Sequence, residues 1–487
     1  MEQVDILLIE TFSYCPHLET AGEISLDFHE KGFEVVFSFI LFDNILDYSP
    51  SIIRRTLLFQ RRIYRVKALI NKLNSSGLYK TEIFTPQRHQ VQLIFNQIRP
   101  SLDAANNIEE IKLICYDSIK IGMAVASSYI SLMGDPFPSI NKKIIARLFK
   151  AAIATYLGTQ QLIEKFKPLA VITFNGRFAT SKPIIDVCKN NDIRIMYHER
   201  GANETKYFLD YCSPHSFICH RKNMNLLWQS DAPEDKVATA KSYFERKISG
   251  EGIGWFSFTR NQVKNLIPEQ RKLKRWTYFS SSDDEYAAVE DAIEHPLFES
   301  QFEAIKWLIS FVDKIDNTEL LIRVHPHKKF KSKRLRRWWE DLAGKNVTVI
   351  ASDSPIDSYA LANSSDLVIV YGSTIGAEAA YLGKPVILLG DAIYRNLGCV
   401  YEPSSITELE ELLSQDSLSA KPKEATYPFG YYNLNYGKNF QYYKPENLFF
   451  GKFLGSYLSY YPPLIQPLHN LKIKIKKIIL SRFNKSK

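Results

Sequence analysis

The segment between Leu367 and Leu389 limits the possible folds of this chain more than any other stretch. It contains an apolar run, a turn of small residues, a helical pattern and a second apolar run, which are Leu367–Val370, Gly372-Ser373-Thr374, Ile375–Leu382 and Pro385–Leu389. Short, continuous apolar runs are typical of strands buried on both faces of a parallel sheet. A strand, a crossover helix and a second strand form the βαβ unit of a doubly wound sheet. The sequence therefore predicts an α/β fold.

Polar residues follow two of the predicted strands. Ser373 and Thr374 follow the first apolar run, and His325 follows the mainly apolar run Leu320–Val324. Ligands of doubly wound sheets bind at the carboxyl ends of the strands, and a small-residue turn at a helix start offers N–H and hydroxyl donors to phosphate. The alternative is that Ser373 only caps a helix and that His325 is a satisfied strand-end histidine. Together, the two positions favour a site for a nucleotide monophosphate or diphosphate.

Length and charge limit the class of protein. At 487 residues the chain is longer than one hydrophobic core usually holds, so we expect two domains. Its composition, 45% apolar and 24% charged, is that of an ordinary globular protein. Most of the formal charge of +9 lies after Glu446, where there is no acidic residue. The nearly neutral remainder argues against nucleic acid as a partner.

The cysteines show no disulfide framework, which is expected of a reducing compartment. Cys212, His215, Cys219 and His220 have side chains that suit zinc, but their spacing matches no structural zinc motif, and Ser216–His220 has the pattern of a strand. We therefore expect buried thiols and no metal site. The six cysteines are Cys15, Cys115, Cys188, Cys212, Cys219 and Cys399.

No export signal or membrane span is visible. The apolar run Val4–Ile9 is too short for a signal peptide and has Asp5 and Glu10 beside it. No run approaches the ~18 apolar residues that a spanning helix needs. We expect a cytoplasmic protein.

The N-terminal part begins in α/β form, with strands over Val4–Glu10 and Glu34–Phe42 and a helix over Glu19–Lys31. Helical patterns then fill about residues 49–167. The first of these, Ser49–Asn74, is amphipathic and basic, with Arg54, Arg55, Arg61, Arg62, Arg65 and Lys67. It is either a solvated helix or a contact surface for anionic lipid or a charged acceptor.

A second candidate site follows the strands Leu169–Phe174 and Arg194–His198. The first strand ends in Asn175-Gly176-Arg177, and the second ends in Glu199-Arg200-Gly201. Asn175 can bind hydroxyl groups, Arg177 can grip a carboxylate, and Glu199 can act as a general base. The alternative is a turn at Gly201 with a surface ion pair between Glu199 and Arg200.

The chain then shows a hinge and a second α/β unit. Ser249–Trp255 is glycine-rich and is the best hinge candidate. A polar helix is predicted over Arg260–Leu273, a strand over Arg275–Phe279 and a small-residue turn from Ser280 to Ser282. A helix near Glu299–Val312 and a last helix capped by Ser405 or Thr407 complete the unit.

The motifs RVHPH, YGSTIGAEAAYLGKPVILLG and DAIYRNLGCVY, with the upstream NGR and ERG turns, resemble bacterial capsule and surface-polysaccharide glycosyltransferases. The resemblance is firm over Arg275–Leu413 and weaker over Ala170–Gly201. Similar families include Kdo transferases and bacterial sialyltransferases. They are GT-B enzymes, in which two Rossmann-like domains face each other across a cleft. The resemblance implies an N-terminal acceptor domain (1–255), a C-terminal donor domain (256–430), and a crossing segment with a basic tail (431–487).

The resemblance also implies roles for individual residues. His325, Ser373 and Thr374 would bind the donor phosphate, and Glu378 would hold the ribose. The acidic-acidic-Gly motif that carries the base in sialyltransferase-like enzymes reads Glu199-Arg200-Gly201 here, with Arg200 in place of the middle acid. The full expected donor set is Ser280, Ser282, Arg323, His325, His327, Ser373, Thr374 and Glu378. The expected acceptor set is Asn175, Arg177 and Arg200, and the expected catalytic residues are Glu199 and His325.

The reaction implied is sugar transfer from a nucleotide sugar to a glycan or glycolipid, without a metal ion or other cofactor. Positioned donors would stabilise the charge that develops on the leaving phosphate. The open alternatives are a polyol-phosphate transferase of the CDP-glycerol type, a nucleotide-sugar 2-epimerase, for which Asp391–Asn396 is a loose match, and a non-catalytic protein of the same fold.

The tail is predicted to bind the inner face of the membrane. An apolar stripe with a basic flank fits a helix in the interface of an anionic bilayer. The alternative is that Phe449–Tyr461 packs on the first domain and only Lys472–Lys487 is loose. The apolar stripe is Leu468, Leu471, Ile475, Ile478, Ile479 and Phe483, and the basic flank is Lys472, Lys474, Lys476 and Lys477.

Overall fold

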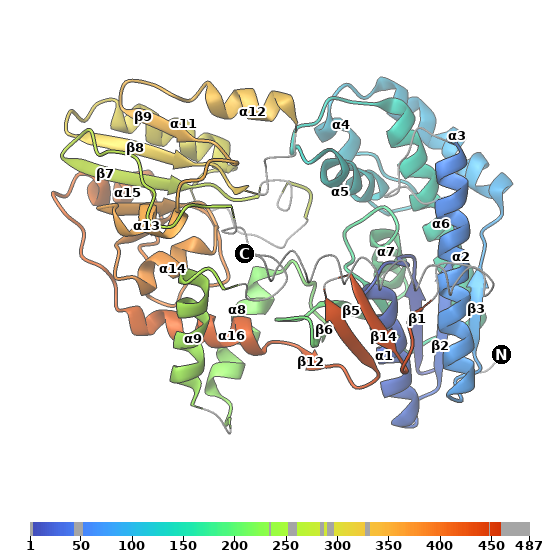
Figure 1. Cartoon of the computed structure of the whole chain (residues 1–487). Helices are drawn as coiled ribbons and strands as arrows, with labels where there is room; N and C mark the ends of the chain where they lie inside the picture. Colours follow the sequence, from blue (N-terminus) through green and yellow to red (C-terminus); the bar gives the residue numbers. More distant parts are fainter. Residues whose placement is uncertain are drawn as a thin grey trace.

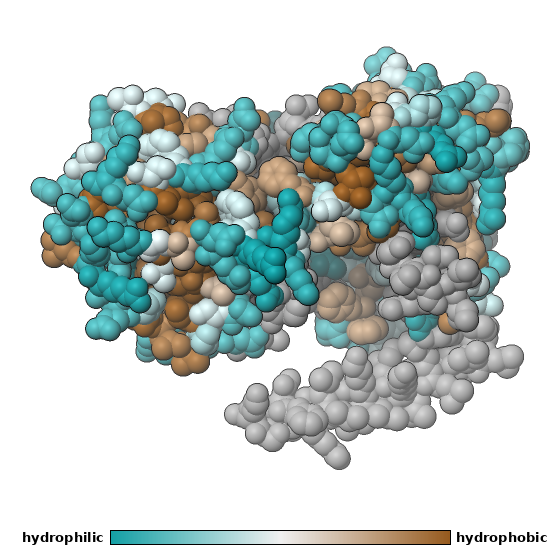
Figure 2. All heavy atoms as spheres, turned by 90° about the horizontal axis from the view of Figure 1, so that it is seen from above, coloured by the Kyte–Doolittle hydropathy of each residue, from teal (hydrophilic) through white to brown (hydrophobic). Residues whose placement is uncertain are grey.

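The computed structural model describes residues 3–42, 52–232, 235–251, 261–282, 287–289, 297–326, 332–447 and 449–458. Over these ranges the chain forms two α/β domains, one around a seven-stranded sheet and one around a five-stranded sheet. They lie side by side in Figure 1, with the N-terminal domain in blue and cyan. This is the GT-B arrangement of two Rossmann-like domains, so the predicted fold class is confirmed. Seen from above, hydrophilic and hydrophobic residues are intermixed on the visible face of both lobes (Figure 2).

The sheet of the first domain has the strand order β12-β6-β5-β4-β1-β2-β3. Strands β1 to β5 pair in parallel, whereas β5 with β6 and β6 with β12 pair antiparallel. β1 and β2 are buried along their whole length, as continuous apolar runs in a parallel sheet should be. The strands are β1 (Ile6–Glu10), β2 (Val35–Ile40), β3 (Thr81–Phe84), β4 (Ala170–Phe174), β5 (Arg194–Arg200), β6 (Lys206–Asp210) and β12 (Lys438–Asn439).

Helices cover this sheet and extend above it in Figure 1. α3, α4, α5 and α6 share one large apolar core, which also receives Ala288 from the second domain. The helices are α1 (His17–Glu30), α2 (Ile52–Ser75), α3 (Arg88–Ala104), α4 (Ile108–Lys112), α5 (Ile121–Met133), α6 (Lys142–Phe166) and α7 (Lys182–Asn190). Among the described residues, no helix is both long and apolar enough to cross a membrane.

Two of the basic residues on α2 face inward rather than toward a lipid or acceptor. Arg65 pairs with Glu19, and both side chains are 3% exposed or less. Arg62 donates to Ser13 Oγ over 3.3 Å. Burying an arginine is tolerable only when its charge and its donors are satisfied, as they are here. These two arginines therefore brace α2 against the loop after β1.

The sheet of the second domain is wholly parallel, in the order β11-β10-β7-β8-β9. The predicted strand–turn–helix–strand unit is confirmed as β10, α14 and β11. The strands are β7 (Lys274–Phe279), β8 (Thr318–Arg323), β9 (Val347–Ile350), β10 (Leu367–Val370) and β11 (Val386–Leu388). The helices are α11 (Gln301–Val312), α12 (Lys333–Glu340), α13 (Ser358–Asn363), α14 (Ile375–Tyr381) and α15 (Ile406–Leu413), the last capped by Ser405 as expected.

Three helices join the two domains along the lower edge of Figure 1. α8 (Phe217–Gln229), α9 (Lys236–Ile248) and α16 (Tyr427–Asn435), which follows the short η2 (Lys423–Thr426), share a core with the second sheet. Residues 217–248 therefore pack with the second domain although they precede residue 255. Residues 252–260 of the expected hinge lie outside the described residues.

After α16 the chain returns to the first domain. Glu23 of α1 accepts the backbone N–H groups of Gln441, Tyr442 and Tyr443 over 2.5, 2.8 and 2.8 Å. The hairpin of β13 (Tyr443–Asn447) and β14 (Phe450–Phe453) packs there, with Phe453 fully buried. The predicted membrane-binding residues Leu468–Phe483 lie outside the described residues.

Three local predictions are wrong. The described part of Arg260–Leu273 is irregular rather than helical, because Asn265 has a φ of 63° and Pro268 interrupts the segment. Ser216 caps α8, so the strand predicted over Ser216–His220 is a helix start. β5 continues through Glu199 and Arg200, because these residues pair with β6 instead of forming a turn.

Candidate functional site

Both sheets place polar residues at equivalent positions. In each, the first strand lies between the second and fourth strands of its Rossmann-like unit, β1 between β2 and β4 and β7 between β8 and β10. Doubly wound sheets bind ligands in the crevice at the carboxyl ends of these central strands. In the first domain Glu10 ends β1 and Asn175 follows β4, and in the second domain Ser280 follows β7.

Glu199 is the centre of a hydrogen-bonded network in the first domain. Its Oε2 accepts from Asn175 Nδ2 over 2.8 Å, and its Oε1 accepts the backbone N–H of Arg200 over 3.0 Å. Asn175 Oδ1 lies 3.1 Å from His215 Nε2, and since an amide oxygen only accepts, His215 is protonated at Nε2. The Glu199 side chain is 22% exposed, so a fixed carboxylate still reaches solvent.

Sequence reasoning missed Glu10 and His17, and it considered His215 only as a possible zinc ligand. His17 Nδ1 lies 3.8 Å from Glu199 Oε1. Glu10 and His198 are fully buried, and Glu10 Oε1 lies 2.5 Å from His198 Nε2. The one available signal was Glu10, a charged residue that ends an apolar strand. No local pattern marks His17, and the cysteines around His215 suggested a metal and not a contact with Asn175.

Burial sets the charge of the two histidines near Glu199. It holds the pKa of His17 well below its usual value, and Arg200 and His198 act in the same direction. Burial, followed by the charge of Arg177, lowers the pKa of His215 to about 3. Both rings are therefore neutral near pH 7, when each has a nitrogen lone pair that can accept a proton or a hydrogen bond.

The turn after β4 has an uncommon backbone that requires its sequence. Asn175 and Gly176 have φ angles of 63° and 90°. A Cβ at Gly176 would lie 2.7 Å from the Tyr197 ring, so only glycine fits there. The turn carries Arg177, whose guanidinium lies over the Phe178 ring at 4.6 Å. The turn thus holds Asn175 toward Glu199 and places Arg177 beside it.

A cavity of about 380 Å³ opens next to this turn. Arg177, Tyr197 and His215 line it from the first domain and the β6–α8 loop, while Ala288 and Val289 line it from the second domain. Arg200, which the sequence also predicts to bind the acceptor, does not line the cavity. Burial lowers the pKa of its guanidinium. The cavity therefore places Arg177, one of the three predicted acceptor residues, at the junction of the two domains.

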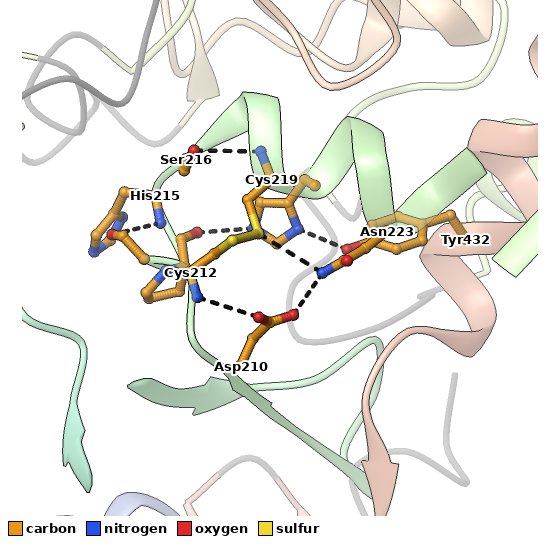
Figure 3. Close-up of a disulfide and its surroundings, with 10 residues drawn as sticks. Asp210, Cys212, His215, Ser216, Cys219, Asn223 and Tyr432 are labelled. Atoms are coloured by element: carbon orange, nitrogen blue, oxygen red, sulfur yellow. Dashed lines mark hydrogen bonds between the residues drawn. A yellow bond between two sulfur atoms is a disulfide. The ribbon is translucent and has the colours of Figure 1, made fainter. Parts of the chain in front are cut away.

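Cys212 and Cys219 form a disulfide, contrary to the expectation of free thiols (Figure 3). The expectation failed because Ser216 starts a helix, which turns Cys219 back toward Cys212. In the part of the chain that the structure describes, the one group of potential metal ligands is Asp210, Cys212 and Cys219. Its two sulfurs are bonded to each other. The remaining cysteines are free.

On the donor side, the ends of β7 and β8 are tied together. Ser280 Oγ accepts the backbone N–H of His325 over 2.8 Å, which leaves the serine proton available for a ligand. The side-chain amide of Gln301 forms two hydrogen bonds with the backbone of Ser281. Its oxygen accepts the Ser281 N–H over 3.0 Å, and its nitrogen donates to the Ser281 carbonyl over 3.2 Å. Ser282 is buried at the end of this turn. His327 lies outside the described residues.

Arg323 holds the backbone rather than facing a ligand. Its guanidinium donates to the carbonyl of Ala351 and, over 3.2 Å, to that of Ser354. Burial lowers its pKa to about 10, and its side chain is almost fully buried. The structure therefore gives this member of the predicted donor set a different contact, because β8 directs the side chain toward the loop after β9.

Helix capping does not explain Ser373 and Thr374. Thr374 is the N-cap of α14 but makes no side-chain capping bond, and its side chain is exposed. The backbone of Ser373 is fixed by Tyr394, whose hydroxyl donates to the Ser373 carbonyl over 2.7 Å. A Cβ at Gly376 would lie 2.3 Å from that hydroxyl, so the glycine permits this contact. The turn is rigid, and its hydroxyls are not used for capping.

Glu378 is buried behind this turn. Its Oε2 accepts from the Tyr359 hydroxyl over 2.8 Å. Its Oε1 lies 3.8 Å from Lys247 Nζ and accepts no hydrogen bond from the described residues. A buried carboxylate oxygen without a donor is costly unless a ligand supplies one. Glu378 thus has the geometry of an acceptor for a ligand hydroxyl.

Two contacts connect the domains on the opposite side from α16. Arg334 Nη2 of α12 donates to Asp135 Oδ1 over 3.0 Å, and the rings of Phe137 and Phe302 meet edge to face at 5.4 Å. In Figure 1 this contact lies at the top, where α12 approaches α4 and α5. The domains therefore touch at both ends of the region between their sheets.

Residues 290–421 match the model of a family described as capsule polysaccharide biosynthesis protein. The match runs from the segment after β7 to the segment after α15 and includes His325, Ser373 and Glu378. The predicted resemblance to capsule biosynthesis proteins is confirmed. The family match supports a role in capsule polysaccharide biosynthesis for the second domain. A search of curated proteins found no match to the chain.

Solved structures show a loose likeness. A Thermosulfurimonas dismutans KpsC beta Kdo 2,4 transferase is 15% identical with a TM-score of 0.35, covering 55% of this chain and 79% of its own. The UDP-GlcNAc 2-epimerase of Neisseria meningitidis is 13% identical with a TM-score of 0.24, covering 89% of this chain and 95% of its own. At these scores neither likeness adds to the argument.

Proposed function

We propose that the protein is a glycosyltransferase that moves a sugar from a nucleotide sugar to a capsule or surface glycan, with Glu199 as the base. The observation that carries this proposal is the cavity at the domain junction. Residues after β4 of the first domain and residues after β7 of the second line the same space. A ligand in this space would contact Arg177 of the first domain and Ala288 and Val289 of the second, as transfer between substrates held by two domains requires.

The acceptor step depends on the network around Glu199. Removing the proton of an acceptor hydroxyl needs a base within hydrogen-bond reach. Asn175 and the backbone of Arg200 hold both oxygens of Glu199 in place. Arg177, on the wall of the adjoining cavity, would orient a carboxylate or hydroxyl group of the acceptor.

The donor step depends on the turns after β7, β8 and β10. Cleavage of the sugar–phosphate bond builds negative charge on the nucleotide phosphate, and fixed donors stabilise it. We assign this role to His325 and to the hydroxyls of Ser280, Ser373 and Thr374. Glu378 Oε1 would accept a ribose hydroxyl, which supplies the donor that this buried oxygen lacks. These groups can act without a metal ion.

A thermal-shift screen tests the proposal directly. A ligand that binds only the folded state raises the melting temperature. We expect one class among CMP, UDP, GDP and CDP conjugates to raise it, and the matching nucleotide sugar to release its nucleotide faster when an acceptor glycan is present. Conversion of a UDP sugar to its 2-epimer, or transfer of glycerol phosphate from CDP-glycerol, would contradict glycosyl transfer.

We further propose that the tail after residue 458 docks the protein on the inner face of the membrane. The support is the sequence alone, an apolar stripe beside eight basic and no acidic residues after Glu446. A lipid-linked acceptor glycan in that membrane would then lie close to the proposed transfer site.

A further inference from the structure

The loop between β6 and α8 reaches the candidate base through two hydrogen bonds. His215 of this loop donates from Nε2 to Asn175 Oδ1 over 3.1 Å. The amide of Asn175 then donates to Glu199 Oε2 over 2.8 Å. Because Asn175 must accept with its oxygen and donate with its nitrogen, the chain of bonds has one direction. Asn175 Oδ1 also accepts the backbone N–H of Arg177 over 3.3 Å, so a displacement of His215 would leave this oxygen with that longer bond and loosen the hold of Asn175 on Glu199.

The loop is fixed at both of its ends. On the β6 side, Asp210 Oδ1 accepts the backbone N–H of Cys212 over 3.1 Å. On the α8 side, His220 Nε2 donates to the Pro214 carbonyl over 2.9 Å, and Ser216 Oγ accepts the N–H of Cys219 over 3.3 Å. Figure 3 shows that the disulfide lies between these two groups of contacts, with Asp210 and Asn223 on one side.

The Cys212–Cys219 disulfide is the covalent link between the two ends. It closes the loop that contains Ser213, Pro214 and His215 onto the first turn of α8. Cys212 also lines the cavity beside Arg177. A short closed loop has few conformations, so the bond restricts where the His215 ring can lie.

We propose that His215 positions Glu199 through Asn175, and that the Cys212–Cys219 disulfide keeps His215 in place, so that reduction slows transfer without weakening donor binding. This inference rests on the proposed function, because it takes Glu199 as the base. The inference makes the position of Glu199, and so the activation of the acceptor, depend on the oxidation state of the disulfide. Binding of the nucleotide sugar does not depend on it.

The reduction step is ordinary thiol–disulfide exchange. A thiolate of a dithiol reductant attacks one sulfur of the pair, and its second thiol then resolves the mixed disulfide. Two electrons pass to the Cys212–Cys219 bond, which breaks into two thiols as two protons are taken up. The reductant becomes a cyclic disulfide.

The first test counts thiols and needs no substrate. The unfolded, unreduced chain should react with an alkylating reagent at four cysteines, Cys15, Cys115, Cys188 and Cys399, and at six after reduction. Alkylation at all six without reductant would overturn the role of the disulfide. Hydrogen exchange of residues 211–216 should speed up on reduction, and unchanged exchange would also overturn it.

The second test separates positioning from mere folding. With the nucleotide sugar that gives the largest thermal shift and a panel of neutral and acidic saccharide acceptors, His215→Ala should lower kcat about tenfold, because misplaced catalytic groups lose such factors. The donor KM should stay unchanged. His215→Gln, whose amide can donate to Asn175, should retain most of the activity, and His89→Ala, on the exposed face of α3, serves as control.

The redox arm uses the same assay with a dithiol. Reduction should lower the wild-type kcat about as much as His215→Ala does. The Cys212→Ala/Cys219→Ala variant should be equally slow and insensitive to the dithiol, whereas Cys115→Ala should respond like wild type. Equal rates before and after reduction would overturn the inference. Absence of transfer by the oxidised wild-type protein would instead refute the proposed function.

Discussion

The Tyr359 hydroxyl donates a hydrogen bond to Glu378 Oε2 over 2.8 Å, while Glu378 Oε1 lies 3.8 Å from Lys247 Nζ. The carboxylate thus has one oxygen that accepts a hydrogen bond and one, beside Lys247, that accepts none from the described residues. The pair joins α13 to the helix of the Ser373 turn. This arrangement makes the ribose role of Glu378 testable.

Glu378→Gln should weaken nucleotide binding about 10- to 150-fold, because one hydrogen bond to a charged group contributes ~1.5–3 kcal/mol. Ribose contacts exist in both the ground state and the transition state, so kcat should change little. Calorimetry with the nucleotide and steady-state kinetics measure the two effects. Tyr359→Phe is the matched control and should weaken binding less. A collapse of kcat with unchanged affinity would give Glu378 another role.

His325→Ala should lower transfer ~100-fold or more, the usual loss on removing one donor to a developing charge. The fold should stay intact, because the bond that ties His325 to Ser280 uses its backbone N–H. Rates and the melting temperature test both halves of the prediction. Wild-type turnover in this variant would contradict the phosphate role.

Glu199→Ala and Arg177→Ala should impair use of the acceptor while the free nucleotide still binds. Both residues belong to the first domain, and Arg177 lines the cavity at the domain junction. Acceptor kinetics and nucleotide calorimetry distinguish the two sides. An equal loss of nucleotide affinity would move this pair to the donor side or to a structural role.

Arg65→Ala should lower the free energy of unfolding by ~3–5 kcal/mol, because it leaves the buried Glu19 without its partner. Urea unfolding measures this loss. Lys67→Ala, on the exposed side of the same helix, should change stability by less than ~0.5 kcal/mol. Similar losses of unfolding free energy in the two variants would show that the Arg65–Glu19 pair contributes no more to stability than an exposed lysine.

Deleting Leu471–Lys487 should release the protein from anionic vesicles, since each basic residue near such a surface contributes ~1 kcal/mol. The effect should be clearest at moderate salt, and activity on a soluble acceptor should remain. Co-sedimentation that neither the deletion nor salt alters would refute the membrane anchor.

The sequence by itself determined the second domain well. β10 and β11 are buried on both faces, so each is a continuous apolar run, and the small residues around Gly372–Thr374 mark the crossover turn. These signals are local, because they arise from backbone geometry and burial within a few residues. The same reasoning located Asn175 after a strand and Ser405 as a cap, whereas Glu199 lies within β5, one residue before its end.

Only the tertiary structure decided which polar residues meet. Glu10, Asn175, Glu199 and His215 lie on four different segments, and their contacts depend on strand order and on the path of the β6–α8 loop. The disulfide depended on a helix start at Ser216, and the contacts of Arg323 depended on the loop after β9. Side-chain partners distant in sequence follow from packing, and no local pattern encodes packing.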